Sequence, residues 1–216
     1  MWQAIIGPKP VWYWIVTALV GLAALGMYLV NDRERKDIRW SIAGLPSGAG
    51  ASGTGYGEPE LWVPPRYDAA QLNAFKKKAG DAPLRSYTLG RAGQKSALQH
   101  YVRPVLIYND ISYAVLLGGF AFLVNLGLAG LWPRPMAGIA ALWALCALVY
   151  AIADIREDQA LASMFAQPSA ITEEQAATAR NWSSIKYWAA LASVSGGLSH
   201  LAFGVVGSVV NGPDPK

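Results

Sequence analysis

Hydrophobic and polar positions are strongly segregated along this chain of 216 residues. Four apolar runs without charged side chains span residues 11–30, 111–132, 135–153 and 187–210. Each run has about the 20 residues that a helix needs to cross the hydrocarbon core of a bilayer. The charged residues collect between the runs, whereas a soluble helix would carry them along one of its faces. The pattern predicts an all-α integral membrane protein, a bundle of four helices.

The segments between these runs differ in length and in character. Residues 1–10 and 211–216 form short ends, and residues 31–110 form a long segment before the second helix. Residues 45–60 are rich in Gly and Ser, which indicates a partly irregular linker. Within the long segment, the sequence predicts one helix over Asp68–Ala79 and another over Gln94–Val105. The first is amphipathic, with Leu72 and Phe75 on one side and lysines nearby, so its basic face either docks on anionic lipid or is solvated.

The segment 154–186 is predicted to be a helical hairpin. The third helix continues with good helix formers to Phe165, and Gln167-Pro168-Ser169 ends it. Thr172-Glu173-Glu174-Gln175 then has the pattern of a capping box. The fourth helix is therefore expected to run from about Thr172 to Val210.

The distribution of positive charge predicts the topology. Of the 18 Lys and Arg residues, fifteen lie in segments 31–112 and 154–186, and the other three are Lys9, Arg134 and Lys216. Positive loops stay in the cytoplasm, so both termini are expected on the other side, which is the periplasm for a bacterial inner-membrane protein. The pI near 9.2 then reflects loops that face anionic lipid, and no nucleic-acid partner is expected.

One group of acidic residues is a candidate for chemistry. Spacings of three and four residues place Asp154, Glu157 and Asp158 on one helical face, where the third helix leaves the membrane. Asp110 enters the second helix at the same depth. The neighbouring basic residues are Arg156, Arg180 and Lys186. The cluster is either a metal or proton site or an ion-pair network that joins the helices. The network is favoured, because basic neighbours oppose a bound cation.

His200 is the one ionisable residue within the four runs, which makes it a functional candidate. Gly196 precedes it by one turn, where a flat ring could approach the backbone. A haem or chlorin ligand is one interpretation, and a hydrogen-bonded packing histidine is the favoured one. The single cysteine, Cys146, excludes an intrachain disulfide and a cysteine-based metal site.

Three short motifs between Pro104 and Ser193 resemble a family of uncharacterised bacterial four-helix transmembrane proteins. These are Asp110 with Tyr113, the stretch Ala153–Leu161, and Ala177-Thr178 through Lys186-Tyr187. The second is similar to a D-x-x-E-[ND]-x-x-L pattern, in which Asp158 occupies the Asn/Asp position. The resemblance implies a four-helix bundle and no established activity.

The sequence contains no catalytic set and no metal-ligand set. Small residues are frequent in the apolar runs and form faces on which membrane helices approach closely. The leading hypothesis is therefore a non-catalytic scaffold or accessory subunit that packs against other membrane subunits or further copies of itself. One alternative is a carrier or enzyme for a lipid or small solute that uses Asp154, Glu157 and Asp158. Another is a haem- or chlorin-binding subunit that uses His200.

Overall fold

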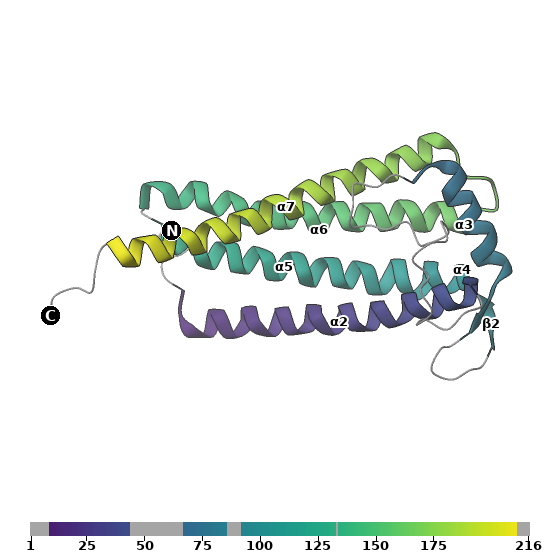
Figure 1. Cartoon of the computed structure of the whole chain (residues 1–216), viewed down its shortest axis with the longest axis horizontal. Coiled ribbons are helices and arrows are strands. Elements are labelled where there is room, and N and C mark those ends of the chain that lie inside the picture. The colour runs from purple at the N-terminus through teal and green to yellow at the C-terminus, as the bar shows by residue number, and fades with distance from the viewer. Residues whose placement is uncertain (1–8, 44–66, 86–91, 133, 211–216) are drawn as a thin grey trace. The chain divides into compact units, whose positions relative to one another are not determined.

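The computed structural model describes residues 9–43, 67–85, 92–132 and 134–210, and most of them are helical (Figure 1). The all-α expectation is thereby confirmed for this part of the chain. The four long helices are α2 (Val11–Ala43), α5 (Ile111–Leu128), α6 (Arg134–Ala166) and α7 (Glu173–Val210). The predicted linker at residues 45–60 lies outside the described residues.

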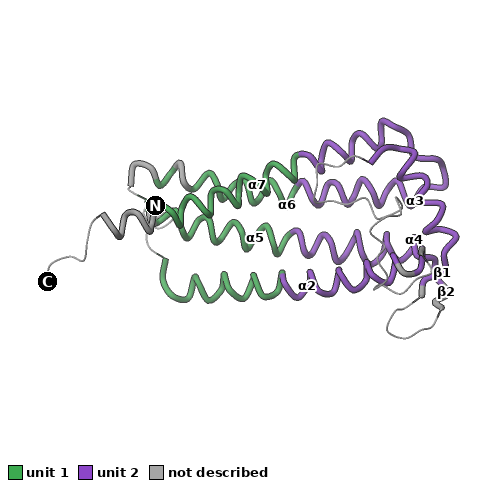
Figure 2. Tube along the Cα trace, viewed as in Figure 1, with its two compact units in different colours: residues 1–24, 115–152, 185–216 green, residues 25–114, 153–184 purple. Residues whose placement is uncertain are grey.

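The chain divides into two compact units (Figure 2). Unit 1 contains residues 1–24, 115–152 and 185–216, and unit 2 contains residues 25–114 and 153–184. Each of the four long helices contributes residues to both units. The two units differ in the size of the side chains that they bury.

Helix α2 continues thirteen residues beyond the apolar run that predicted it, from Val30 to Ala43. The added residues are mostly charged, and Lys36 pairs with Asp32 one turn earlier, 2.6 Å between Nζ and Oδ2. Such pairs at i and i+4 stabilise a helix in water. The end of the apolar run is therefore not the end of the helix.

The helical hairpin of residues 154–186 has the predicted helix boundaries. Helix α6 ends at Ala166, directly before Gln167-Pro168-Ser169. Helix α7 begins at Glu173 behind the expected capping box. In this box the Gln175 amide donates to Thr172 Oγ1 at 3.3 Å, and the Thr172 amide donates to Gln175 Oε1 at 3.0 Å.

The segment before α5 contains a small sheet that the sequence did not predict. Helix α3 (Ala69–Asp81) forms close to the expected place and has a capping box of Asp68 and Gln71. Strands β1 (Pro83–Arg85) and β2 (Ala92–Ser96) then pair antiparallel. Residues 94–96, which were expected to start a helix, belong to β2.

A short helix and a wider one lead from the sheet into α5. Ser96 accepts the Gln99 amide at 3.2 Å and so caps α4 (Ala97–His100). A π-helix, η1 (Tyr101–Asp110), joins α4 to α5, and a 3-10 turn, η2 (Ala129–Leu131), follows α5. The predicted helix over Gln94–Val105 is therefore correct from Ala97 to Val102, and the chain then kinks at Arg103, whose backbone is extended (φ −138°, ψ 115°).

Unit 2 has a core of large apolar side chains. The Phe75 ring packs against the rings of Tyr101 and Phe165, with centroids 5.2 and 5.5 Å apart. Leu72 is fully buried in the same cluster. The apolar face of α3 therefore contacts protein, and whether its basic face docks on anionic lipid or is solvated stays a prediction. Burial of large side chains is what water drives in a soluble domain.

Unit 1 has the opposite arrangement. Its buried apolar residues are mainly alanines, whereas its large apolar side chains point outward. A Cβ atom at Gly118 would overlap Ala151, so α5 and α6 approach closely there. The exposed side chains include Leu142, Leu145, Val149 and Ile152 on α6 and Leu191, Val194, Leu198 and Leu201 on α7.

Two helical stretches among the described residues are long and apolar enough to cross a membrane, Val11–Arg39 and Ala97–Leu128. They include the first of the four predicted runs and most of the second. The predicted spans at residues 135–153 and 187–210 stay predictions, as does membrane insertion itself.

Lys76 of α3 caps the C-terminal end of α6. Its Nζ atom donates to the carbonyl oxygens of Met164 at 3.0 Å, Ser169 at 2.8 Å and Gln167. The last carbonyl groups of a helix have no partner within it, and they form the negative end of its dipole. A lysine there supplies both hydrogen bonds and a favourable charge.

Replacing Lys76 with Met keeps the length of the side chain and removes the three hydrogen bonds. We expect a loss of about 1–2 kcal/mol in the free energy of unfolding, because carbonyl groups at the end of α6 lose a charged donor. Helical circular dichroism during chemical unfolding of the detergent-solubilised protein measures this. Lys77→Met is the control, since Lys77 is exposed, and an equal loss in both variants would contradict the capping role.

Candidate polar sites

Asp110 lies at the end of η1, and residues of α2 hold its carboxylate. Arg35 Nη2 donates to its two oxygens at 3.1 and 2.9 Å. Asn31 Nδ2 donates to Oδ1 of the same carboxylate. Asn31 and Arg35 are four residues apart and so share one face of α2. The contact therefore joins α2 to the start of the second apolar helix.

The side chains of this contact are largely removed from solvent, with Arg35 20% and Asp110 7% exposed. A buried ion pair loses hydration, and its attraction offsets that loss only with good geometry and further hydrogen bonds. Asn31 supplies one such bond. Asp154 lies close enough to interact electrostatically with Asp110.

Glu157 is fully buried and accepts two hydroxyl groups. Ser183 of α7 donates to Oε1, and Tyr67, directly before α3, donates to the same oxygen at 3.3 Å. Burial, followed by the negative charge of Glu157, raises the pKa of the Tyr67 hydroxyl above its ordinary value. Tyr67 therefore stays protonated as a donor at neutral pH, and the contact joins three parts of unit 2.

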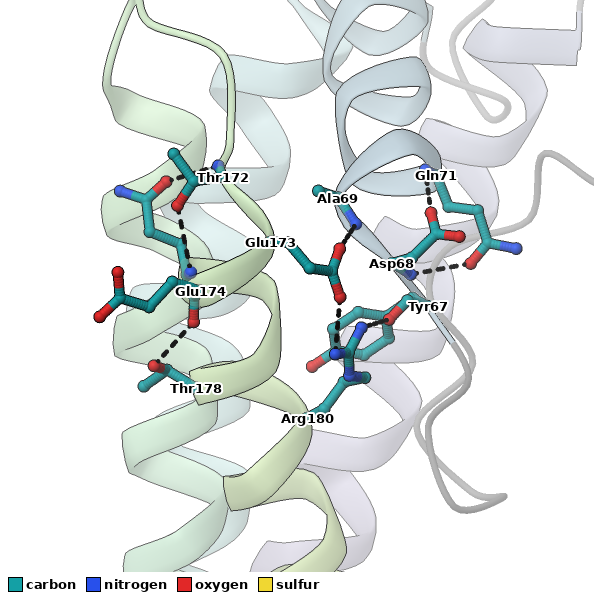
Figure 3. A network of polar contacts seen from close by, with 10 residues as sticks. Tyr67, Asp68, Ala69, Gln71, Thr172, Glu173, Glu174, Thr178 and Arg180 are labelled. Carbon is teal, nitrogen blue, oxygen red and sulfur yellow. Dashed lines mark hydrogen bonds and ion pairs between the residues drawn. The ribbon is translucent and has the colours of Figure 1, made fainter.

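A second network ties the start of α3 to the start of α7 (Figure 3). Glu173 accepts the backbone amide of Ala69 at 3.0 Å and pairs with Arg180 at 2.7 Å. Arg180 also donates to the backbone oxygen of Tyr67 at 3.0 Å. The hydrogen bond from Ala69, followed by Arg180, lowers the pKa of Glu173 below its ordinary value of 4.5. Arg180 thus binds both the carboxylate of Glu173 and the backbone oxygen of Tyr67.

The predicted acidic residues are all buried. Asp154, Glu157 and Asp158 lie inside unit 2, and Lys186 is buried in unit 1. Among the described residues, no group of three His, Cys, Asp or Glu side chains converges to hold a metal ion. The metal interpretation of the cluster therefore has no geometric support in that part of the chain.

Four residues of these contacts were not predicted from the sequence: Asn31, Arg35, Tyr67 and Ser183. A signal existed for the first two, because they are one helical turn apart directly after an apolar run. Arg180, which was expected beside the cluster, binds Glu173 and the Tyr67 backbone. Tyr67 follows the residues that the structure leaves undescribed, and its position in the sequence carries no periodic signal.

His200 on α7 is fully buried, and its ring meets Trp132 edge-on with centroids 5.6 Å apart. The space beside Gly196, where a cofactor ring was expected to approach, is taken by Trp143, since a Cβ atom there would overlap that indole. A flat ring does approach the backbone of α7, but it belongs to the chain itself. The space at Gly196 is therefore not open to a haem or chlorin ring, and the cofactor interpretation of His200 stays a prediction.

Comparison with known proteins gives no match to a family model, a curated protein or a solved structure. The resemblance to bacterial four-helix membrane proteins therefore stays an expectation. Function has to be argued from the contacts themselves.

Replacing Arg35 with Gln leaves the buried carboxylate of Asp110 without its cation. We expect a loss on the order of 3 kcal/mol in the free energy of unfolding, because an uncompensated buried charge is costly. The double variant Arg35→Gln/Asp110→Asn should recover most of it. Chemical unfolding followed by circular dichroism measures both.

The control is Lys36→Gln, which breaks the exposed pair with Asp32 and should cost less than about 1 kcal/mol. If the double variant is as unstable as Arg35→Gln, charge compensation is not what the pair provides. The double variant also keeps the comparison possible if the single variant does not fold.

Glu173 predicts a pH dependence at the acid end. Its pKa is lowered in the folded chain, so its charge stabilises the fold above the ordinary pKa of 4.5, and this contribution is lost as the pH falls through the folded value. The stability difference between the native chain and Glu173→Gln should be full near neutral pH and vanish in acid. Thermal unfolding across that range measures it. Glu174→Gln controls for the general loss of negative charge, and a difference that persists in acid would contradict the mechanism.

Proposed function

We propose that this chain is a non-catalytic accessory subunit or scaffold of a bacterial inner membrane, with four membrane-spanning helices. Both termini lie in the periplasm in this proposal, and the segments 31–110 and 154–186 lie on the cytoplasmic side. The observation that carries it is the contrast between the two units in the kind of side chain that each buries.

Unit 1 exposes the side chains that a water-soluble protein would bury. Leu22 of α2 is 64% exposed, and Val194 and Leu198 of α7 are 61% and 63% exposed. Such side chains in water would form an apolar patch far larger than soluble monomers tolerate. Alanine and glycine fill the contacts between the helices instead, as expected where lipid removes the hydrophobic drive for helices to associate. These features support insertion of unit 1 in a bilayer.

The polar contacts of unit 2 favour a structural role over catalysis. The described donors to Asp110 and Glu157 are side chains from other segments, which join α2 to η1 and Tyr67 to α6 and α7. A carrier or enzyme would instead direct such carboxylates toward a substrate. The absence of a metal-binding group among the described residues points the same way.

Two exposed glycines support a helical partner. A Cβ atom at Gly26 on α2 or at Gly138 on α6 would meet no other described part of the chain within 4 Å. Glycine costs helix stability, so its presence on an outer helix face is explained if another helix approaches there. The partner is either a different membrane subunit or a second copy of this chain.

The test begins with carbonate extraction of membranes, in which an integral protein stays in the pellet. Native mass spectrometry after gentle solubilisation should then give a mass above the 23.1 kDa of one chain. Gly26→Leu or Gly138→Leu should lower that mass and leave the fold unchanged, because a Cβ atom at either position meets no other described part of the chain within 4 Å. Release by carbonate would contradict insertion, and a clean monomer without partners would contradict the scaffold.

The same measurements on two further variants separate the structural role of these carboxylates from a role in catalysis. Asp154→Asn and Glu157→Gln should reduce the yield of folded protein if these carboxylates hold unit 2 together. Variants that fold and assemble normally would favour the carrier or enzyme alternative.

A further inference from the structure

One exposed face of α2 changes from apolar to charged within unit 2. Leu25 and Leu29 lie on this face, and more than half of each side chain is exposed. Asp32, Lys36 and Arg39 follow at alternating spacings of three and four residues, so they continue the same face of the helix. About half of each of the two cationic side chains is exposed. The face is therefore a continuous exposed stripe of two leucines followed by three charged residues.

The two cations of this stripe reach back toward the leucines. Lys36 Nζ lies 2.6 Å from Asp32 Oδ2, although the two residues are one helical turn apart. Arg39 Nη2 lies 3.9 Å from Oδ1 of the same carboxylate, which is two turns before its own position. Side chains of a helix tilt toward its N-terminal end, and in α2 that is the direction of the apolar run. Both positive charges therefore converge beside Asp32, about 5 Å along the helix from Leu29.

The charge and the position of this group match the phosphate of a lipid. One carboxylate and two cations give the group a net charge of +1. The headgroup layer is about 5–7 Å thick on each side of the hydrocarbon core. With Leu29 at the edge of the hydrocarbon, the converging charges lie within that layer. The cytoplasmic leaflet, where this end of α2 lies in the proposed topology, has a negative surface potential from its anionic lipids.

We propose that Asp32, Lys36 and Arg39 form a binding site for the phosphate of an anionic phospholipid, whose acyl chains lie along Leu25 and Leu29. Lys36 and Arg39 donate to the phosphate oxygens, so the phosphate replaces Asp32 as their counter-charge. This inference rests on the proposed insertion in a membrane and deepens it by naming a lipid partner.

The two leucines favour a lipid over a soluble anion. A free phosphate, or an acidic segment of a soluble protein, would meet only the charged group and leave Leu25 and Leu29 in water. A phospholipid covers the whole stripe, because its phosphate is joined to apolar chains. The net positive charge favours an anionic lipid over a zwitterionic one, whose own ammonium would be repelled by Lys36 and Arg39.

Native mass spectrometry of the detergent-solubilised chain, titrated with phosphatidylglycerol or phosphatidylcholine, measures the apparent Kd of each lipid. We expect the native chain to bind phosphatidylglycerol more tightly. Lys36→Gln/Arg39→Gln should weaken that binding by roughly tenfold or more, because both cations that hold the phosphate are lost. The affinity for phosphatidylcholine should stay unchanged.

Lys77→Gln/Lys95→Gln is the matched control, since it removes the same charge from exposed positions on α3 and β2. It should keep most of the affinity for phosphatidylglycerol. Equal weakening by the two double variants overturns the site on α2 in favour of the basic face of α3.

Asp32→Asn tests the site in the opposite direction, which a loss of fold could not imitate. Without the competing carboxylate, Lys36 and Arg39 should bind phosphatidylglycerol roughly fivefold more tightly. Unchanged or weaker binding by this variant overturns the proposal. Circular dichroism of each variant measures whether its helices are retained.

Two further outcomes separate the lipid site from the alternatives. Equal affinity of the native chain for the two lipids overturns the site even when carbonate leaves the chain in the membrane pellet, so this failure is distinct from a failure of insertion. Equal affinity for glycerol phosphate, which carries the same anion without acyl chains, overturns the lipid in favour of a soluble ligand.

Discussion

The carboxylate of Asp110 has to be matched by a cation from another helix, because it lies where little solvent reaches it. Arg35 and Asn31 provide this match only if α2 stays helical beyond its apolar run and turns one face toward η1. The long α2 and the position of η1 thus depend on the same contact. Glu157 imposes a similar requirement on Tyr67 and Ser183, since hydroxyl groups from two segments must meet on one oxygen.

The two units show two ways of packing the same helices. Large aromatic and aliphatic side chains fill unit 2, as water requires of a folded domain. Unit 1 relies on alanine, glycine and close backbone approach, with its large side chains on the outside. A single chain therefore buries large side chains in one unit and small ones in the other. The change from one mode to the other falls within each long helix.

The helices were predictable where local signals determine them, and the contacts were not. Gln167-Pro168-Ser169 and the Thr172 capping box set the boundaries of α6 and α7 through interactions within a few residues. The end of α2 was missed because polarity was taken as the end of a helix. The sheet was not predicted, because β1 and β2 stabilise each other by pairing and their own residues show no strand periodicity.

The polar contacts of unit 2 were also predicted only in part, because local signals determine some of their residues and not others. The shared face of Asp154, Glu157 and Asp158 follows from helix geometry, and these residues are indeed buried. Their partners come from distant segments, as Tyr67 does across ninety positions to Glu157. No regular spacing in the sequence predicts contacts between residues that lie so far apart. Trp143 occupies the space beside Gly196. This contact likewise depends on how α6 and α7 pack and not on the sequence of either helix alone.

Unit 2 is built from two separate parts of the chain, and this determines the order in which its contacts can form during synthesis. Its first part ends at residue 114 and its second begins at residue 153, so a complete apolar stretch of the chain is synthesised between them. Lys76 cannot reach the end of α6, nor can Ala69 reach Glu173, until the ribosome has made those later residues. Helix α3 can pack on Tyr101 early, but the part of its apolar face that meets Phe165 waits until that residue is made. A nascent chain stalled in that interval presents one side of the Phe75 ring to whatever chaperone or membrane surface is near.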